Sequence, residues 1–343
     1  MAVVDPVFAP LLAGKTFGVW RVTQLRLTVV PERDWGKFFS GDCYLVFSSV
    51  GGEHIFFWLG AESSNDEQTV AAMKAVELDN LFNGMPVQHR EIQGHESVRF
   101  RKLFRDGIVT LLGGTESGLR QLDKVNHVPR LFQVRGGKTP ALTEVELNWS
   151  AMNHGDTFVV DTGSHIFIWA GETSSGMEKM IAAGLASKLR DRLGEEIVHI
   201  LDGEEDGMAP DELEAWIKVL PLEDKNNVKA AEHENDRKVD QNLAKEIALF
   251  KCSDFSGELE IQLVKRGELE GNDLDGDDAF IVDGNHQGIW VWLGRRSNAM
   301  ERKEAMGAGQ KFIEKRGLDK NTRLTKVNMG GEPEEFKSLF MKW

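Results

Sequence analysis

The stretch WLGAESSNDE at residues 58–67 recurs as WAGETSSGME at 169–178 and as WLGRRSNAME at 292–301. Each copy reads Trp, Leu or Ala, Gly, two residues, Ser, Ser or Asn, two residues, Glu. The copies begin 111 and then 123 residues apart, which indicates one domain type used three times. What the three copies share, and where they differ, therefore decides how the chain is interpreted.

The surroundings of this cassette repeat as well. A strand-like run that opens with an acid comes before each Trp, at 42–46, 156–160 and 278–282, and a second apolar run ends in the Trp. Two short β-rich runs joined by a turn that contains Gly predict a pair of strands. Helix-forming residues follow each Glu as far as a Gly, at Gly84, Gly194 and Gly317, and this Gly is expected at the C′ position.

Each unit then continues with another strand-like run and a short amphipathic piece. The fold class is therefore predicted as α+β, with three domains that each pack strands against one long and one short helix. The predicted bounds are 1–120, 121–222 and 246–343, with a linker at 223–245. Acids and bases crowd the linker and large apolar residues are few, so it cannot bury much surface.

Composition excludes several classes of protein. The formal charge of −14 argues against a general nucleic-acid binder. We find neither an apolar N-terminal signal segment nor an apolar run long enough to span a bilayer. Two cysteines in different repeats do not suggest a disulfide framework, so a cytosolic protein is expected. Bases outnumber acids between Arg99 and Lys138, which fits either a solvated surface or a site for an acidic partner or anionic lipid.

The Glu that ends each cassette has two interpretations. Ser or Asn followed three residues later by Glu is the signature of a helix N-cap, and Ser-x-x-Glu forms a capping box. However, an Asp also opens the upstream strand of every copy, at Asp42, Asp156 and Asp278. Two carboxylates and backbone carbonyls would suit Ca²⁺. The Glu would then cap the helix without the ion and turn to the metal when it binds.

Other motifs fail. The run DLDGDD at 273–278 hints at an EF-hand loop, but Asp278 stands where that loop needs Gly and Gly284 where it needs Glu. The nine histidines, among them His54 and His89, lack the paired spacing of a zinc site and are interpreted as ordinary surface or strand residues. No nucleophile and base show a spacing signature, so the chain is not expected to be an enzyme.

Several longer motifs carry a family resemblance: WRV at 20–22, PVQHREIQG at 86–94, RLFQV at 130–134 and FKSLF at 336–340. With them the chain resembles the gelsolin-type actin regulators, in particular short three-domain members such as severin, fragmin and macrophage capping protein. The resemblance covers essentially the whole chain. It implies gelsolin-like domains with a central mixed sheet between a long and a short helix, calcium-dependent activity and capping of barbed filament ends.

Carried over residue by residue, the resemblance places the family's repeated calcium site on three sets of residues. They are Gly41, Asp42 and Glu67 with the Thr115 carbonyl; Gly155, Asp156 and Glu178; and Asp277, Asp278 and Glu301. A further carboxylate for the second set comes from the linker in the family, and here Glu232, Glu234 and Asp236 compete for that role.

The resemblance also implies contacts with actin. A second ion shared with actin falls on Asp79, Gly84 and Pro86, and the helix around Met73, Val76 and Asn80 would enter a cleft of actin. By its spacing alone, that helix face would instead belong to the domain's own core. Filament-side contacts map onto Arg135, Lys138 and Lys179.

The lipid-binding segment of the family keeps little positive charge at 105–112, so phosphoinositide binding is expected to be weak at most, with 120–138 as its remaining basic stretch. The expected function is calcium-dependent severing of actin filaments and capping of their barbed ends in the cytoplasm, and nucleation stays open. Capping without severing is the alternative. A calcium buffer or scaffold unrelated to actin is a third class. It would be favoured if the protein bound calcium but did not co-sediment with actin.

Overall fold

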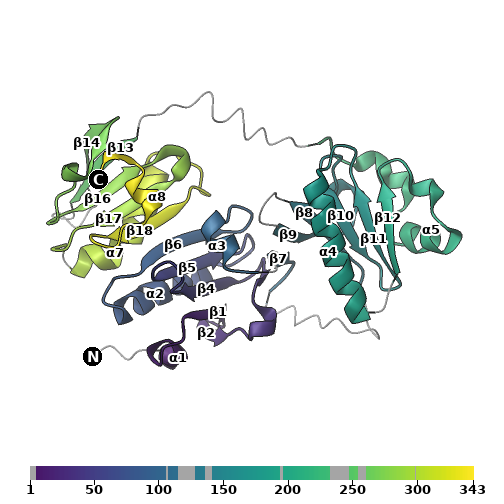
Figure 1. Cartoon of the computed structure of the whole chain (residues 1–343), viewed down its shortest axis with the longest axis horizontal. Helices are drawn as coiled ribbons and strands as arrows, with labels where there is room; N and C mark the ends of the chain where they lie inside the picture. The colour runs from purple at the N-terminus through teal and green to yellow at the C-terminus, as the bar shows by residue number, and fades with distance from the viewer. Residues whose placement is uncertain are drawn as a thin grey trace. The chain divides into compact units, whose positions relative to one another are not determined.

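The computed structural model describes residues 5–105, 107–114, 128–135, 141–193, 196–231, 247–253, 260–297 and 299–343. The chain forms two compact units (Figure 1). Unit 1 combines residues 1–35, 42–100 and 239–343, and unit 2 combines residues 36–41 and 101–238. The first and third cassettes therefore belong to one unit and the second cassette to the other.

Unit 1 is built on a ten-stranded sheet with the order β14-β13-β16-β17-β18-β6-β5-β4-β1-β2. Its strands are β1 (Phe17–Thr23), β2 (Arg26–Val29), β4 (Cys43–Ser48), β5 (His54–Leu59), β6 (Val87–Ile92), β13 (Ala248–Ser253), β14 (Glu260–Arg266), β16 (Ala279–Asp283), β17 (Ile289–Leu293) and β18 (Leu324–Asn328). A parallel pair of β15 (Leu269–Glu270) and β19 (Phe340–Lys342) stands apart from this sheet.

The two halves of this sheet follow one plan. β4 pairs with β5 and β16 with β17 as antiparallel hairpins, as the sequence predicts. The long helices α2 (Asn65–Leu81) and α7 (Ala299–Lys315) then lead to β6 and β18, which run parallel to β5 and β17. A parallel neighbour requires a crossover of a dozen residues or more, and these helices supply it.

A seam joins the two halves: β6 pairs with β18 in antiparallel register, with His89 opposite Thr325 and Gln88 opposite Lys326. Figure 1 shows these strands side by side, in blue and yellow. Strands from opposite ends of the chain thus form one continuous sheet.

Apolar residues cover both faces of the sheet in unit 1. Every residue of β4 and β5 is buried, which explains why these runs are largely apolar instead of alternating. α2 and α7 pack on one face through small or apolar side chains such as Ala71, Ala75 and Phe312. α8 (Glu334–Lys337) contributes Phe336 to a second apolar cluster. Two shorter α-helices are α1 (Ala9–Leu12) and α3 (Val98–Lys102).

Unit 2 contains a seven-stranded sheet with the order β12-β11-β10-β8-β9-β7-β3. Its strands are β3 (Lys37–Phe39), β7 (Ile108–Leu111), β8 (Arg130–Arg135), β9 (Ala141–Val145), β10 (Thr157–Asp161), β11 (His165–Ala170) and β12 (Glu196–Leu201). β3 and β7 come from the segment that the sequence assigns to the first domain, yet they extend this sheet. The same hairpin, long helix and parallel strand recur as β10, β11, α4 (Gly176–Leu193) and β12.

The core of unit 2 has two layers. Ala182, Ala186 and Leu189 of α4 pack on one face of the sheet. On the other face, Trp149 packs edge to face against both Trp169 and Trp216, the last from α5 (Pro210–Ile217). Among the described residues, no helix is long and apolar enough to cross a membrane. The fold is thus α+β, with mixed sheets flanked by helices.

Candidate functional site

The cassette turn lies against the strand-opening Asp in all three repeats. Gly60 N–H donates to the Asp42 carbonyl, Gly171 N–H to that of Asp156 and Gly294 N–H to that of Asp278, each at 3.0 Å. The sequence places each Gly 15 to 18 residues after its Asp without showing their contact. The fold therefore brings the cassette and the Asp together three times.

Close packing explains why the cassette carries Gly. A Cβ on Gly171 would lie 2.6 Å from the His154 carbonyl oxygen, and one on Gly294 would lie 2.3 Å from that of Gly276. The first cassette Ser then closes the turn, because the hydroxyls of Ser63, Ser174 and Ser297 each donate to the carbonyl of the cassette Gly at 2.7 Å. These two positions are structural.

The cassette Trp is structural too. In each repeat its indole binds a Glu that the sequence analysis did not single out. The indole N–H of Trp58 donates to Glu96, that of Trp169 to Glu205 and that of Trp292 to Glu332, at 3.0, 2.7 and 2.9 Å. Each Glu also accepts the backbone N–H of a nearby Gly. A Gly-x-Glu pattern at 94–96, 203–205 and 330–332 was the available signal.

The terminal Glu caps the following helix in the first two repeats. Ser64 N–H donates to Glu67 Oε2 at 3.0 Å, and Glu67 N–H donates to Ser64 Oγ at 3.2 Å. Ser175 and Glu178 repeat the same two distances. The capping interpretation is confirmed for these two repeats, while Asn298 and the side chain of Glu301 lie outside the described residues.

Asp42 lies in a charged and buried environment. Its side chain is 2% exposed and its Oδ2 lies 2.7 Å from Arg21 Nη2. Burial raises the pKa of the neighbouring Cys43 thiol to about 12, and the charges of Glu67 and Asp42 add to that rise. Both carboxylates thus act on the same thiol.

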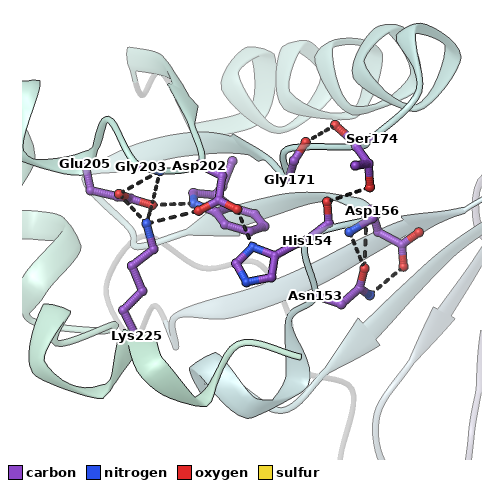
Figure 2. Close-up of polar contacts among 12 residues, drawn as sticks. Asn153, His154, Asp156, Gly171, Ser174, Asp202, Gly203, Glu205 and Lys225 are labelled. Atoms are coloured by element: carbon purple, nitrogen blue, oxygen red, sulfur yellow. Dashed lines mark hydrogen bonds and ion pairs between the residues drawn. The ribbon is translucent and has the colours of Figure 1, made fainter. Parts of the chain in front are cut away.

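Asp156 is oriented by amide groups. Gln133 Nε2 donates to its Oδ2 at 2.5 Å and Asn153 Nδ2 at 2.8 Å. The Asn153 Oδ1 in turn accepts the backbone N–H groups of Gly155 and Asp156 at 2.8 and 3.0 Å. Figure 2 shows Asn153 directed at Asp156. This loop presents a carboxylate in a fixed direction.

The third repeat carries two cations on its acids, whereas in the first Arg21 pairs with Asp42. Lys251 Nζ lies 2.6 Å from Asp278 Oδ2, and Arg296 pairs with Asp277. The hydrogen bond to Asp278 raises the pKa of Lys251. A calcium ion here would have to displace an ammonium and a guanidinium group.

The donor chemistry of the first two repeats fits a hard cation, since it consists of carboxylate and carbonyl oxygens. Among the described residues, no three His, Cys, Asp or Glu side chains gather as a metal cluster, so carbonyl oxygens would have to complete the shell. Gly41 N–H donates to the Gly113 carbonyl at 2.8 Å. Thr115, Glu232, Glu234 and Asp236 lie outside the described residues.

Residues of the third repeat hold the candidates for the second ion. Lys326 Nζ lies 2.6 Å from Asp79 Oδ2, and these side chains are only 1% and 6% exposed. Asn328 donates its amide to the Gly84 carbonyl. Pro86 is buried at the start of β6. No local sequence pattern predicts Lys326 or Asn328, because their partners lie more than two hundred positions away in the chain.

The outer face of α2 is open. Met73 is 65% exposed, Asn80 is exposed and Val76 is half-buried, whereas Ala71, Ala75 and Leu78 fill the core. The interpretation of Met73 as a core residue is therefore wrong. Lys179 is exposed on the first turn of α4. Arg135 ends β8, but its side chain and the whole of Lys138 lie outside the described residues.

A buried histidine pair lies beside the seam. His54 Nδ1 is 3.0 Å from His89 Nε2, and Arg99 Nη1 is 3.3 Å from His54 Nε2. Burial lowers the pKa of His54, helped by the Arg99 charge, and lowers that of His89 well below its usual value. Both are strand residues, as expected, but neither is a surface residue.

A family model and three relatives that match this chain are all of the gelsolin type. A family model described as a gelsolin repeat matches residues 25–101, 120–206 and 260–337. Gelsolin-like protein 1 of Caenorhabditis elegans is 35% identical over 99% of this chain and 72% of its own length. Actin depolymerising venom protein gelsolin 1 of Platymeris rhadamanthus is 33% identical over 96% of this chain and 90% of its own. Advillin of Mus musculus is 35% identical over 94% of this chain, which spans only 40% of that protein.

Proposed function

The chain belongs to the gelsolin family, and we propose that it is a calcium-dependent actin-binding protein that severs actin filaments and caps their barbed ends. Proteins of this family are not enzymes, so the chemistry to explain is binding and its regulation. Actin, as monomer and as filament, is the proposed partner, and the cytoplasm and its cytoskeleton are the proposed location.

The observation that carries the proposal is the open face of α2 beside its C-terminal acid. Met73 and Asn80 are exposed there, and Asp79 lies at the same end of the helix. An exposed apolar side chain on a helix that ends at a carboxylate suits insertion into a partner's groove with a shared cation. The Platymeris rhadamanthus relative, which this chain matches over 90% of its length, is named for actin depolymerisation.

Calcium is the proposed cofactor. Asp42 with Glu67, and Asp156 with Glu178, would supply the carboxylates, with the Gly41 and Gly155 carbonyls as further ligands. Two hard anionic ligands at each site would attract Ca²⁺. We expect Asp277 and Asp278 to bind more weakly, because Arg296 and Lys251 compete for them.

The seam between the first and third repeats would make actin binding conditional. Lys326 supplies the positive charge that the second ion would bring to Asp79. Calcium and actin would therefore use this end of α2 only after Lys326 leaves it. Lys179, with Arg135 and Lys138, remains the proposed contact with the filament side, and weak phosphoinositide binding stays open.

Capping without severing is the alternative, since both activities would use these residues. Microscopy of fluorescent filaments with and without Ca²⁺ separates them. Internal breaks that require Ca²⁺ are the expected result. Growth arrest without breaks would favour the alternative, and filaments indifferent to the protein in both conditions would contradict the proposal.

A further inference from the structure

One lysine of the segment that follows the second repeat binds two acids of that repeat. Lys225 lies in the 3-10 helix η7 (Leu222–Asn227), and its Nζ is 2.6 Å from both carboxylate oxygens of Glu205. The same ammonium lies 3.0 Å from Asp202 Oδ1. Figure 2 shows Lys225 reaching up between these two acids. We call Lys225, Asp202 and Glu205 the linker clasp.

The charges of the clasp reinforce one another. Burial would lower the pKa of Lys225, but hydrogen bonds to Glu205 and Asp202 raise it. Burial would likewise raise the pKa values of both acids. Hydrogen bonds lower them again: those from His154 and Lys225 lower the pKa of Asp202, and that from Lys225 lowers the pKa of Glu205. All three groups are therefore charged near neutral pH.

The clasp uses the turn that the three repeats share and adds an acid that only the second repeat has. Glu96, Glu205 and Glu332 all hold the cassette Trp. The position of Asp202 is taken by Gln93 in the first repeat and by Met329 in the third, because each of the three donates its backbone N–H to the carbonyl of the residue after the cassette Trp. Only the second repeat has an acid there, so Asp202 serves something specific to that repeat.

His154 connects the clasp to the candidate calcium loop. Its Nδ1 pairs with Asp202, as Figure 2 shows, and it immediately precedes Gly155 and Asp156. Its backbone N–H donates to the Lys229 carbonyl at 3.1 Å, and its own carbonyl accepts from Thr173 N–H at 2.9 Å. His154 thus touches the clasp, the linker and the cassette turn.

The linker backbone follows the same loop. Lys229 N–H donates to the Met152 carbonyl at 3.0 Å, and Asn153 and Lys229 form a parallel bridge. Ala231 lies so close that a Cβ on Gly155 would be 3.1 Å from the Ala231 Cβ. Upstream, Trp149 Nε1 donates to the Pro221 carbonyl at 2.7 Å. The clasp therefore fixes the register of the linker against Gly155 and Asp156.

We propose that Lys225 is a positioning residue for the calcium site of the second repeat, which it supports through Asp202, Glu205 and His154. The inference rests on the proposed function, because it assumes that Asp156 binds calcium. Holding the loop in place before the ion arrives lowers the ordering cost of binding, and groups that orient metal ligands commonly contribute 10- to 100-fold to metal affinity.

For the loss of Lys225, electrostatics alone predicts a change in Ca²⁺ affinity opposite in sign to the one that positioning predicts, so the proposal can be tested. Replacing Lys225 with Met removes a positive charge near the site and leaves Asp202 and Glu205 without their ammonium partner, so Coulomb attraction would tighten Ca²⁺ binding. Positioning predicts weaker binding. The two explanations differ in direction and not only in size.

The experiment is a calorimetric calcium titration of the full chain. Asp156→Asn first identifies the heat that belongs to the second repeat. In Lys225→Met, we expect that site to weaken about tenfold, with faster hydrogen exchange at 153–156 and 227–231 in the calcium-free protein. Lys225→Arg should restore most of the calcium affinity and most of the protection from hydrogen exchange. Lys218→Met, which removes an equal charge from an exposed position after α5, should change neither.

Unchanged or tighter binding in Lys225→Met would overturn the inference while the calcium site stands, and so would weaker binding without faster exchange. If Asp156→Asn removed no binding heat, the proposed calcium site would fail and the inference with it. Lys225→Gln, which keeps one donor to the acids, replaces Lys225→Met if that variant does not fold.

Discussion

Single residues of this protein carry two tasks, and Glu67 and Glu178 are the clearest cases. Each caps a helix in the present structure and is also a proposed calcium ligand. These tasks need different properties of the side chain, since a cap needs an oxygen acceptor and a calcium ligand needs negative charge. Substitution can therefore separate them.

We expect Glu67→Gln and Glu178→Gln to weaken calcium binding at their own sites while costing less than about 1 kcal/mol of stability, because the amide oxygen still accepts from Ser N–H. Calcium titration and thermal unfolding measure the two effects. The matched controls are Ser64→Ala and Ser175→Ala, which should cost about 1 kcal/mol as lost caps and leave both carboxylates in place. Gln variants that unfold their domains would show that capping is the main task.

The buried pair of His54 and His89 predicts a loss of stability in acid. Both pKa values are lowered in the folded protein, so the unfolded chain binds more protons below about pH 6.5 and unfolding becomes easier as the pH falls. Arg99 faces His54, and Glu335 pairs with Arg99. Glu91 opposes the trend, since burial raises its pKa to about 7.

A comparison of variants isolates His54 from Glu91. His54→Asn should remove up to about 1.4 kcal/mol of the stability lost per pH unit between pH 6.5 and 5.5, as measured by denaturant unfolding at several pH values. His95→Asn is the control, because His95 is exposed. A His54→Asn profile parallel to that of the unchanged protein would contradict the prediction.

At the scale of elements, the cassette is a turn that joins a strand to a long helix. Its Trp, Gly and first Ser each make the same contact in all three repeats. This turn fixes where the helix begins, and hence where the capping Glu lies relative to the strand-opening Asp.

Gly171→Ala should destabilise the second repeat by about 1 to 3 kcal/mol, because the new methyl group would collide with the His154 carbonyl. Gly176→Ala, five positions on at the start of α4, should be neutral or stabilising by up to about 1 kcal/mol, since nothing lies within 4 Å of its added Cβ. Denaturant unfolding of both variants is the measurement. Equal effects would argue against the close approach at Gly171.

At the scale of the whole molecule, the first and third repeats share one sheet through β6 and β18. Polar side chains cross this seam: Lys326 pairs with Asp79, and Arg99 pairs with Glu335 at 2.6 Å. Gln88 is buried opposite Lys326, and its side-chain amide has no hydrogen-bond partner among the described residues. A seam with such buried polar groups opens at lower cost than an apolar core would.

Lys326→Met should destabilise unit 1 by about 3 kcal/mol, because removing one partner of a buried ion pair leaves the other charge in a poor environment. It should also lower the calcium concentration needed for actin co-sedimentation, because Asp79 becomes available to the second ion. Lys320→Met, an equal loss of charge at an exposed position, serves as the control. An unchanged calcium requirement in a folded Lys326→Met protein would show that the ion pair is only structural.

The sequence by itself determined the threefold repeat, the order of strands and helices in each repeat, and the family. These follow from local patterns, since strand hairpins, capped helices and a recurrent turn are written in contiguous residues. The pairing of each cassette with its upstream Asp was also predictable, because the two recur together three times.

Only the tertiary structure decided which residues those acids meet. Lys326 on Asp79, Lys251 on Asp278 and Lys225 between Asp202 and Glu205 join positions that are distant in the chain or lie outside any motif. The pairing of β6 with β18 and the exposure of Met73 belong to this group as well. The physical reason is that long-range contacts follow from how repeats pack, and a single sequence pattern does not encode which surfaces meet.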